Sequence, residues 1–153
     1  MKTIADPNVL DDLLARLARV TPESPRQWGK MSPAEMLCHL GDAGDFVLGR
    51  RIPPGIQPSG RRRPVMKWLA LRAPMRWPHG YPTRSSMDPQ RDGTKPAQFE
   101  ADRARVADGL RALAAATGPD LARDHMVFGP MSLADWHRWA YRHLDHHLRQ
   151  FGV

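Results

Sequence analysis

Three histidines fall within five positions near the carboxyl end of the chain, in the segment HLDHH that begins at His143. His143 and His147 are four residues apart, so in a helix their imidazoles lie one turn apart on the same face. Two imidazoles at this spacing suit chelation of one divalent metal ion, and a third from another element leaves an open coordination position. The spacing therefore favours a metal site, provided that this segment is helical.

The segment from residue 131 to the carboxyl end predicts an amphipathic helix. At 100° per residue, His143 and His147 share an inward face with Trp136, whereas the arginines of the segment point away from it. His146 lies about 60° to one side of that face. We interpret it as an outer hydrogen-bonding partner of the ligands or as an interface residue.

A second helix predicts a facing histidine. Ser32 suits the N-cap, Pro33 the first helical position, and Glu35 completes a capping box. His39 then lies on the apolar stripe of this helix, which contains Met36, Leu40, Ala43 and Val47.

Each inward histidine, taken singly, has an alternative interpretation as a core residue with hydrogen bonds to both ring nitrogens. Taken together, His39, His143 and His147 favour a metal site. No general base is marked, and the nearest candidates are His146 and Asp42, one turn from His39. Leu144 stands where a zincin helix needs glutamate after its first histidine, which excludes that class. The remaining three are interpreted as surface or loop residues: His79, His125 and His137.

Two further segments have helical spacing of apolar residues. One begins with Asp6 as cap and Pro7 as first residue and extends to about residue 20, and the other runs from about Pro96 to near residue 117. No strand-like alternation of comparable length occurs. The pattern predicts an all-α fold, a helical bundle with one long crossover between its second and third helices.

The crossover carries most of the positive charge. Residues 50–95 hold eleven Lys or Arg against two Asp, within a chain whose formal charge is +7, and they hold eight of the fifteen prolines. These prolines exclude regular helix or central strand over most of the crossover, although residues 64–72 predict a short helix. Arg61, Arg62 and Arg63 are candidates for a rim that attracts an anion, and the alternative is a solvated loop.

Length and composition limit the remaining choices. The 153 residues with 41% hydrophobic content suit one domain spanning residues 1–153. Cys38 is the only cysteine, which excludes an intramolecular disulfide, and we expect it to be a small buried residue. No apolar segment has the length of a secretion signal or a membrane span, so a cytoplasmic protein is expected.

Two segments also carry a family resemblance. WGKMSPAEMLCHLGDA at 28–43 and FGPMSLADWHRWAYRHLDHHLRQFG at 128–152 resemble the DinB-like superfamily, in particular its branch of small domains of unknown function. The resemblance implies a four-helix bundle with up-down-down-up topology, often homodimeric. It also implies zinc or nickel held by three histidines, which correspond here to His39, His143 and His147.

The resemblance bears on function as well. Characterised members include metal-dependent thiol-S-transferases and a thiol-dependent maleylpyruvate isomerase, in which the metal makes a low-molecular-weight thiol nucleophilic at neutral pH. The first hypothesis is thus a metal-dependent thiol-S-transferase or hydrolase with a small anionic substrate. The alternative is a non-catalytic domain with a structural or vestigial metal site, whose basic Arg/Trp crossover contacts a partner or nucleic acid. Nucleic-acid and membrane contact through the crossover rank below the metal site.

Overall fold

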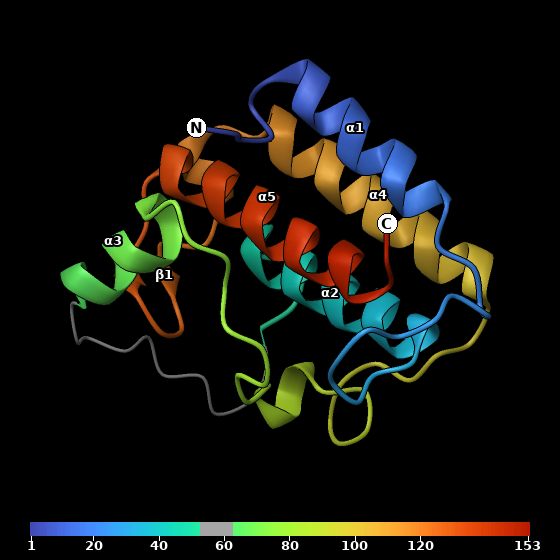
Figure 1. Ribbon diagram of the computed structural model, residues 1–153. Helices are drawn as coiled ribbons and strands as arrows, with labels where there is room; N and C mark the ends of the chain where they lie inside the picture. The colour runs from blue at the N-terminus through green and yellow to red at the C-terminus, as the bar shows by residue number, and fades with distance from the viewer. Residues whose placement is uncertain (53–62) are drawn as a thin grey trace.

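Four long helices pack side by side around a common interior (Figure 1): α1 (Pro7–Ala18), α2 (Pro33–Val47), α4 (Phe99–Ala115) and α5 (Leu133–Gln150). The computed structural model describes residues 1–52 and 63–153. α1 and α5 run in one direction and α2 and α4 in the other, so the topology is up-down-down-up. The predicted all-α bundle with a long crossover between α2 and α4 is confirmed.

The helix starts follow the predicted caps. The Asp6 side chain accepts a hydrogen bond from the Asn8 backbone N–H at 3.0 Å and caps α1. Ser32 and Glu35 form both hydrogen bonds of a capping box at the start of α2. α4 begins at Phe99, about three residues after the predicted start, because the backbone at Gln98 is still extended and its side chain caps nothing.

The crossover contains α3 (Pro64–Arg72), as predicted, and a 3-10 turn, η1 (Ser85–Met87). α3 packs against α5. The Lys67 ammonium lies 2.6 Å from Asp135 Oδ2, and the Arg72 guanidinium lies 3.1 Å from Asp135 Oδ1. Asp135 also closes the capping box of α5 with Ser132, so one carboxylate fixes both the start of α5 and the position of α3.

A short hairpin precedes α5 and was not predicted. Its strands β1 (Asp124–His125) and β2 (Gly129–Pro130) are antiparallel, with His125 opposite Gly129, and a second 3-10 turn, η2 (Gly118–Asp120), lies before them. His125 is buried, and its Nδ1 accepts hydrogen bonds from the backbone N–H groups of Val127 and Phe128. The interpretation of His125 as a surface or loop residue was therefore wrong as to exposure, because its imidazole closes the turn from inside.

α2 is the central helix of the bundle. Every residue from Met36 to Ala43 is buried, whereas none of the other long helices has a continuous buried run of this length. α2 packs most extensively against α4 and also contacts α5. The polar residues of α2 that lie inside must therefore find partners inside.

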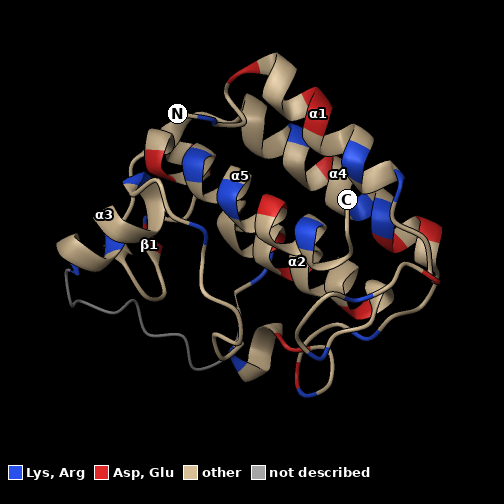
Figure 2. Ribbon diagram, viewed as in Figure 1, with Lys and Arg blue, Asp and Glu red and all other residues tan. Residues whose placement is uncertain are grey.

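Charged residues are spread over the described chain. Figure 2 shows basic segments along α4 and α5 as well as in the crossover. Several are paired, including Arg16 with Asp145 at 2.9 Å and Arg105 with Asp45 at 2.6 Å. No helix among the described residues has the length and apolar character needed to cross a membrane.

Candidate metal centre

α5 places two imidazoles one turn apart on its inward face. The ring centroids of His143 and His147 lie 5.0 Å apart. The helix begins at a capping box in which both hydrogen bonds are formed, and it continues to Gln150. The position of each residue around the helix is therefore fixed from Ser132 onward. The predicted placement of both histidines on one face is confirmed.

α2 supplies the third imidazole from the opposite side. His39 is 8% exposed, and its ring lies 5.1 Å from that of His143 and 4.9 Å from that of His147. One nitrogen from each of the three rings lies within 4.8 Å of the others. His39, His143 and His147 form one group, called here the three-histidine cluster.

Backbone and side-chain acceptors orient two of these rings. His39 Nδ1 lies 2.8 Å from the carbonyl oxygen of Met87, and His147 Nδ1 lies 2.9 Å from Gln150 Oε1. Both partners are acceptors, so each Nδ1 carries the proton and donates it. The Nε2 atoms of His39 and His147 then carry the lone pairs that can bind a metal, although His39 Nε2 here lies at hydrogen-bond distance from His143 Nε2. Such outer hydrogen bonds are typical of metal-ligating histidines.

The sequence did not predict these two hydrogen-bond partners, Gln150 and the Met87 carbonyl. Gln150 follows His147 by three residues on the same face, and that spacing was a usable signal. Met87 belongs to η1 in the crossover and reaches the cluster through its backbone carbonyl, 48 residues from His39. Every residue has a backbone carbonyl, so a contact of this kind cannot be recognised from the residue type.

Burial keeps the cluster neutral. It lowers the pKa of His39, and it lowers the pKa values of His143 and His147 well below the usual range, with a further lowering by the neighbouring imidazoles. Neutral imidazole is the form that binds metal. The cluster is thus in its ligating form at neutral pH.

The donor set fits a divalent transition metal. Imidazole ligands suit zinc, nickel and copper, and a tetrahedral zinc ion holds its nitrogen ligands about 3.4 Å apart. His39 Nε2 and His143 Nε2 are 3.1 Å apart. One nitrogen from each of the three rings lies within 4.8 Å of the other two, and three ligands leave one coordination position of a tetrahedral ion open.

His146 lies beside the cluster, not in it. Its ring is 5.3 Å from that of His147 and packs near Trp28, Trp77 and His79. Burial, with a contribution from Arg149, lowers its pKa to about 4. Its Nδ1 is buried and has no hydrogen-bond partner among the described residues.

Asp42 is fully occupied by other contacts. Its side chain is inaccessible and lies 2.6 Å from the Arg51 guanidinium and 2.9 Å from that of Arg105. It also accepts hydrogen bonds from the hydroxyl and backbone N–H of Thr94. Burial raises the pKa of Asp42, but the bonds from Thr94 and Arg105 outweigh it, so the pKa is lowered.

The other predicted residues lie apart from the cluster or outside the described chain. Arg61 and Arg62 lie outside the described residues, and Arg63 is exposed immediately before α3. His137 is buried with its Nε2 3.1 Å from the carbonyl oxygen of Leu113, so its interpretation as a surface residue was wrong. The α5 face that carries His137 packs on α4, and the angle of His137 around the helix did not indicate this second contact.

Two remaining residues match their interpretation. His79 is exposed, as expected of a loop residue. Cys38 is buried, and burial together with Asp102 raises its pKa to about 12, so it stays a thiol at neutral pH.

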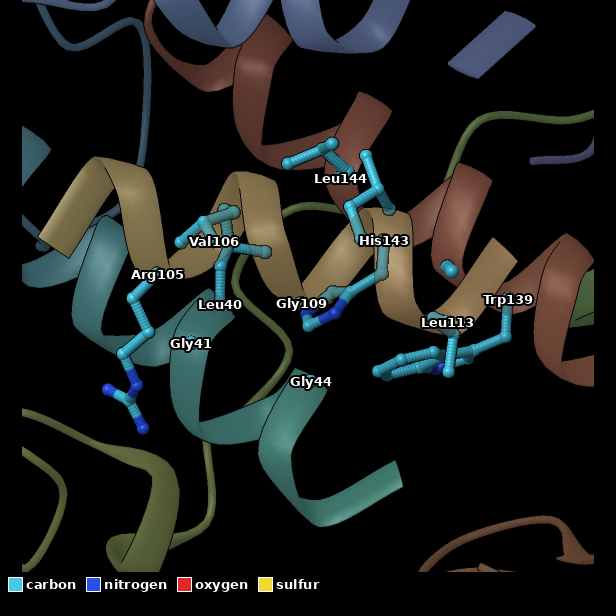
Figure 3. A pocket seen from close by; sticks show the side chains of 12 residues that line it. Leu40, Gly41, Gly44, Arg105, Val106, Gly109, Leu113, Trp139, His143 and Leu144 are labelled. Carbon is cyan, nitrogen blue, oxygen red and sulfur yellow. The ribbon is translucent and has the colours of Figure 1, made fainter. Parts of the chain in front are cut away.

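A small cavity borders His143 on one side. It measures about 40 Å³ and lies between α2, α4 and α5. Figure 3 shows Gly44 and Gly109 facing each other across it, with Trp139 toward one end and Arg105 toward the other. Its volume has room for water, but it is far below that of a typical substrate pocket.

Comparison with known proteins yields one match. A family model described as the DinB superfamily matches residues 8–151. No curated protein and no solved structure matches the chain.

Proposed function

The chain belongs to the DinB superfamily, and from this premise we propose that its three-histidine cluster holds a divalent metal ion, zinc or nickel, that activates a low-molecular-weight thiol or water toward a small anionic substrate. The reaction class is a thiol-S-transfer or a hydrolysis. Such an ion, held by three imidazoles, supplies a Lewis acid with an open position that lowers the pKa of a bound thiol or water.

The convergence of the three rings supports this proposal most directly. Their ligating nitrogens lie within 4.8 Å of one another although the chain separates His39 from His143 by 104 positions. Two of the three rings are held in the ligating tautomer by Met87 and Gln150. Hydrogen bonding at both ring nitrogens of His39 accounts for the approach of His143 Nε2, but that pairing does not require a third nitrogen, from His147, at the same place.

Aromatic side chains shield the cluster from water. The ring of Trp139 lies 4.7 Å from that of His143, and the ring of Trp77 lies 6.0 Å from it. Excluding water strengthens electrostatic interactions with a bound ion. The two tryptophans therefore give the cluster a low-dielectric wall.

The candidates for a general base have other contacts that support different roles. Asp42 is held by two guanidinium groups and Thr94, and these contacts suit a structural role in fixing the crossover to the bundle. His146, with a pKa lowered to about 4, is a weak base at neutral pH. Activation of a thiol by lowering its pKa needs no strong base from the protein.

The alternative is a non-catalytic domain that binds a partner through the crossover. The exposed apolar side chains of α3 favour it: Val65, Met66, Trp68 and Leu69. Lys67 and Arg72 on the same helix are paired with Asp135, which argues against a nucleic-acid surface there. Partner binding of this kind would persist after substitution of the three histidines, whereas metal binding would be lost.

Metal content tests the metal site on which the proposed function depends. In untagged protein reconstituted with zinc or nickel, elemental mass spectrometry should find about one ion per chain. His39→Ala, His143→Ala and His147→Ala should each lose the ion while circular dichroism shows retained helix. His137→Ala removes another buried α5 imidazole outside the cluster and should keep the ion. Wild-type protein that stays folded and metal-free after reconstitution would contradict the proposal.

A further inference from the structure

Two buried polar atoms next to the three-histidine cluster lack partners. Trp28 Nε1 and His146 Nδ1 make no hydrogen bond among the described residues. Two other indole nitrogens are satisfied: Trp77 Nε1 donates to the Ala70 carbonyl at 2.7 Å and Trp136 Nε1 to the Ala122 carbonyl at 2.8 Å. Buried polar groups are normally paired, so two unpaired ones in one place call for a ligand.

The two atoms belong to one group of rings, called here the Trp28 cluster: Trp28, Trp77, His79 and His146. The ring centroids of Trp28 and His146 lie 5.8 Å apart. The His146 ring lies 5.3 Å from that of His147, and the Trp77 ring 6.0 Å from that of His143. The Trp28 cluster therefore adjoins the metal ligands directly.

One hydrogen-bonded path holds both clusters together. The Gln150 side-chain amide donates to the Trp28 carbonyl at 2.9 Å and accepts from His147 Nδ1. The backbone that carries the indole is thus positioned by the residue that orients a metal ligand. A group bound at Trp28 is held at a fixed place relative to the three-histidine cluster.

An exposed side chain covers the Trp28 indole. His79 stacks on it with centroids 4.0 Å apart and planes 8° from parallel. His79 is exposed and precedes Gly80, whose φ of 75° lies in the left-handed region. Because an exposed ring can rotate into solvent, the cover can be displaced without disturbing the bundle.

The chemistry of the two atoms selects the ligand. An indole N–H can only donate, so the ligand must offer an acceptor there, and a neutral imidazole can donate from Nδ1. The surroundings carry net positive charge: the Arg142 guanidinium lies 5.9 Å from the Trp77 ring, and Arg149 and Asp145 both act on His146. Two donors in a basic setting suit an anion with two acceptor oxygens.

We propose that Trp28 Nε1 and His146 Nδ1 bind a carboxylate, at a subsite that lies beside the three-histidine cluster and next to the indole face that His79 covers. Calling this carboxylate part of the substrate rests on the proposed function. Binding of the carboxylate itself does not, because neither donor is a member of the three-histidine cluster.

Indole N–H resonances of the ¹⁵N-labelled full chain test the subsite, with propionate as probe and propionamide as its neutral control. The chain has five tryptophans, and Trp28→Phe identifies the Trp28 signal. Propionate should shift the Trp28 signal saturably, while the signal of Trp136, which is hydrogen-bonded and is not a member of the Trp28 cluster, stays in place. His146→Phe should weaken propionate binding about tenfold, the effect of losing one hydrogen bond to a charged group.

His79→Ala keeps both donors and removes the cover, so it should bind propionate at least as well as wild type. The proposal is overturned if propionate leaves the Trp28 signal unmoved, if propionamide moves it equally, or if the Trp28 signal of His79→Ala no longer responds to propionate. Running the titration with and without zinc separates the two proposals. A shift in protein that never takes up metal supports the subsite and contradicts the proposed function, whereas metal uptake without a shift does the reverse.

Discussion

Gln150 is the residue on which the geometry of the proposed site most depends. It is 4% exposed and joins His147 to the Trp28 carbonyl through the two ends of one amide. The neighbouring Gly29 has a φ of 79°, and a Cβ there would lie 2.5 Å from Gln150 Nε2. Gly29 thus provides both the left-handed turn and the space that the amide occupies.

Gln150→Ala should lower metal affinity by about 10–100-fold, because His147 loses the hydrogen bond that fixes its tautomer and orientation. Gln150→Glu keeps an acceptor for His147 and should recover most of the affinity. Competition with a chelator of known affinity measures both. Gln27→Ala is the control, since the Gln27 amide donates to the Pro25 carbonyl and contacts none of the three histidines. Unchanged affinity in Gln150→Ala would show that this bond does not support the site.

At this scale the sequence was informative where helix angle alone decides position. The three inward histidines follow from 100° per residue and from the stripes of their helices. His137 was misplaced because α5 packs on more than one neighbour, and its burial depends on α4. Met87 could not be found because its contribution comes from the backbone.

At the scale of elements, α2 and α4 approach each other over glycines. Gly44 of α2 and Gly109 of α4 line the cavity beside His143, and a Cβ at either would meet nothing within 4 Å. Gly41 differs, because a Cβ there would lie 2.9 Å from Arg105 Nη1.

Gly44→Ala and Gly109→Ala should each raise the free energy of unfolding by about 0.5–1 kcal/mol, since alanine loses less backbone entropy in a helix and has room here. Gly41→Ala should lower it, because the new methyl group displaces the Arg105 guanidinium from Asp42 and Asp45. Urea denaturation of the three variants checks the sign. A destabilised Gly44→Ala would mean that the cavity closes in solution.

Helix boundaries were predictable to the extent that side chains encode them. The caps at Asp6 and Ser32 are both used as the pattern indicated. The start of α4 was placed too early because Gln98 supplies no side-chain cap. The hairpin before α5 has only two residues per strand, too few for a period of two to be visible.

For the molecule as a whole, Asp42 joins three parts of the chain. It lies on α2 and binds Arg51 and Thr94 at the two ends of the crossover and Arg105 on α4. The crossover is thereby tied to the bundle at both ends. The family resemblance implied the topology, but nothing in the sequence indicated this anchor, because no local spacing connects the pair Asp42 and Arg51 with the pair Thr94 and Arg105.

Asp42→Asn should lower the free energy of unfolding at pH 7 by about 2 kcal/mol, less than the roughly 3–5 kcal/mol of a fully buried pair because Arg51 and Arg105 are partly exposed. The pKa of Asp42 is lowered on folding, so its contribution is present above the unfolded pKa of about 3.9 and is lost as pH falls further. The difference between wild type and Asp42→Asn should therefore shrink below about pH 4.

Chemical denaturation across a pH series measures this difference. Asp108→Asn breaks an exposed pair with Arg111 on the surface of α4 and should change stability by less than about 1 kcal/mol. An Asp42→Asn penalty that stays constant down to pH 3 would contradict the assignment of that penalty to the charge of Asp42.

The separation of His39 from His143 also has a consequence in time. A ribosome adds roughly 5–20 residues per second, so the 104 positions between them take roughly 5–20 s to synthesise. Throughout that interval the nascent chain holds His39 without either histidine of α5. The complete three-histidine cluster would then select its metal ion late in synthesis or afterwards. By that time the first three helices of the bundle have already been synthesised.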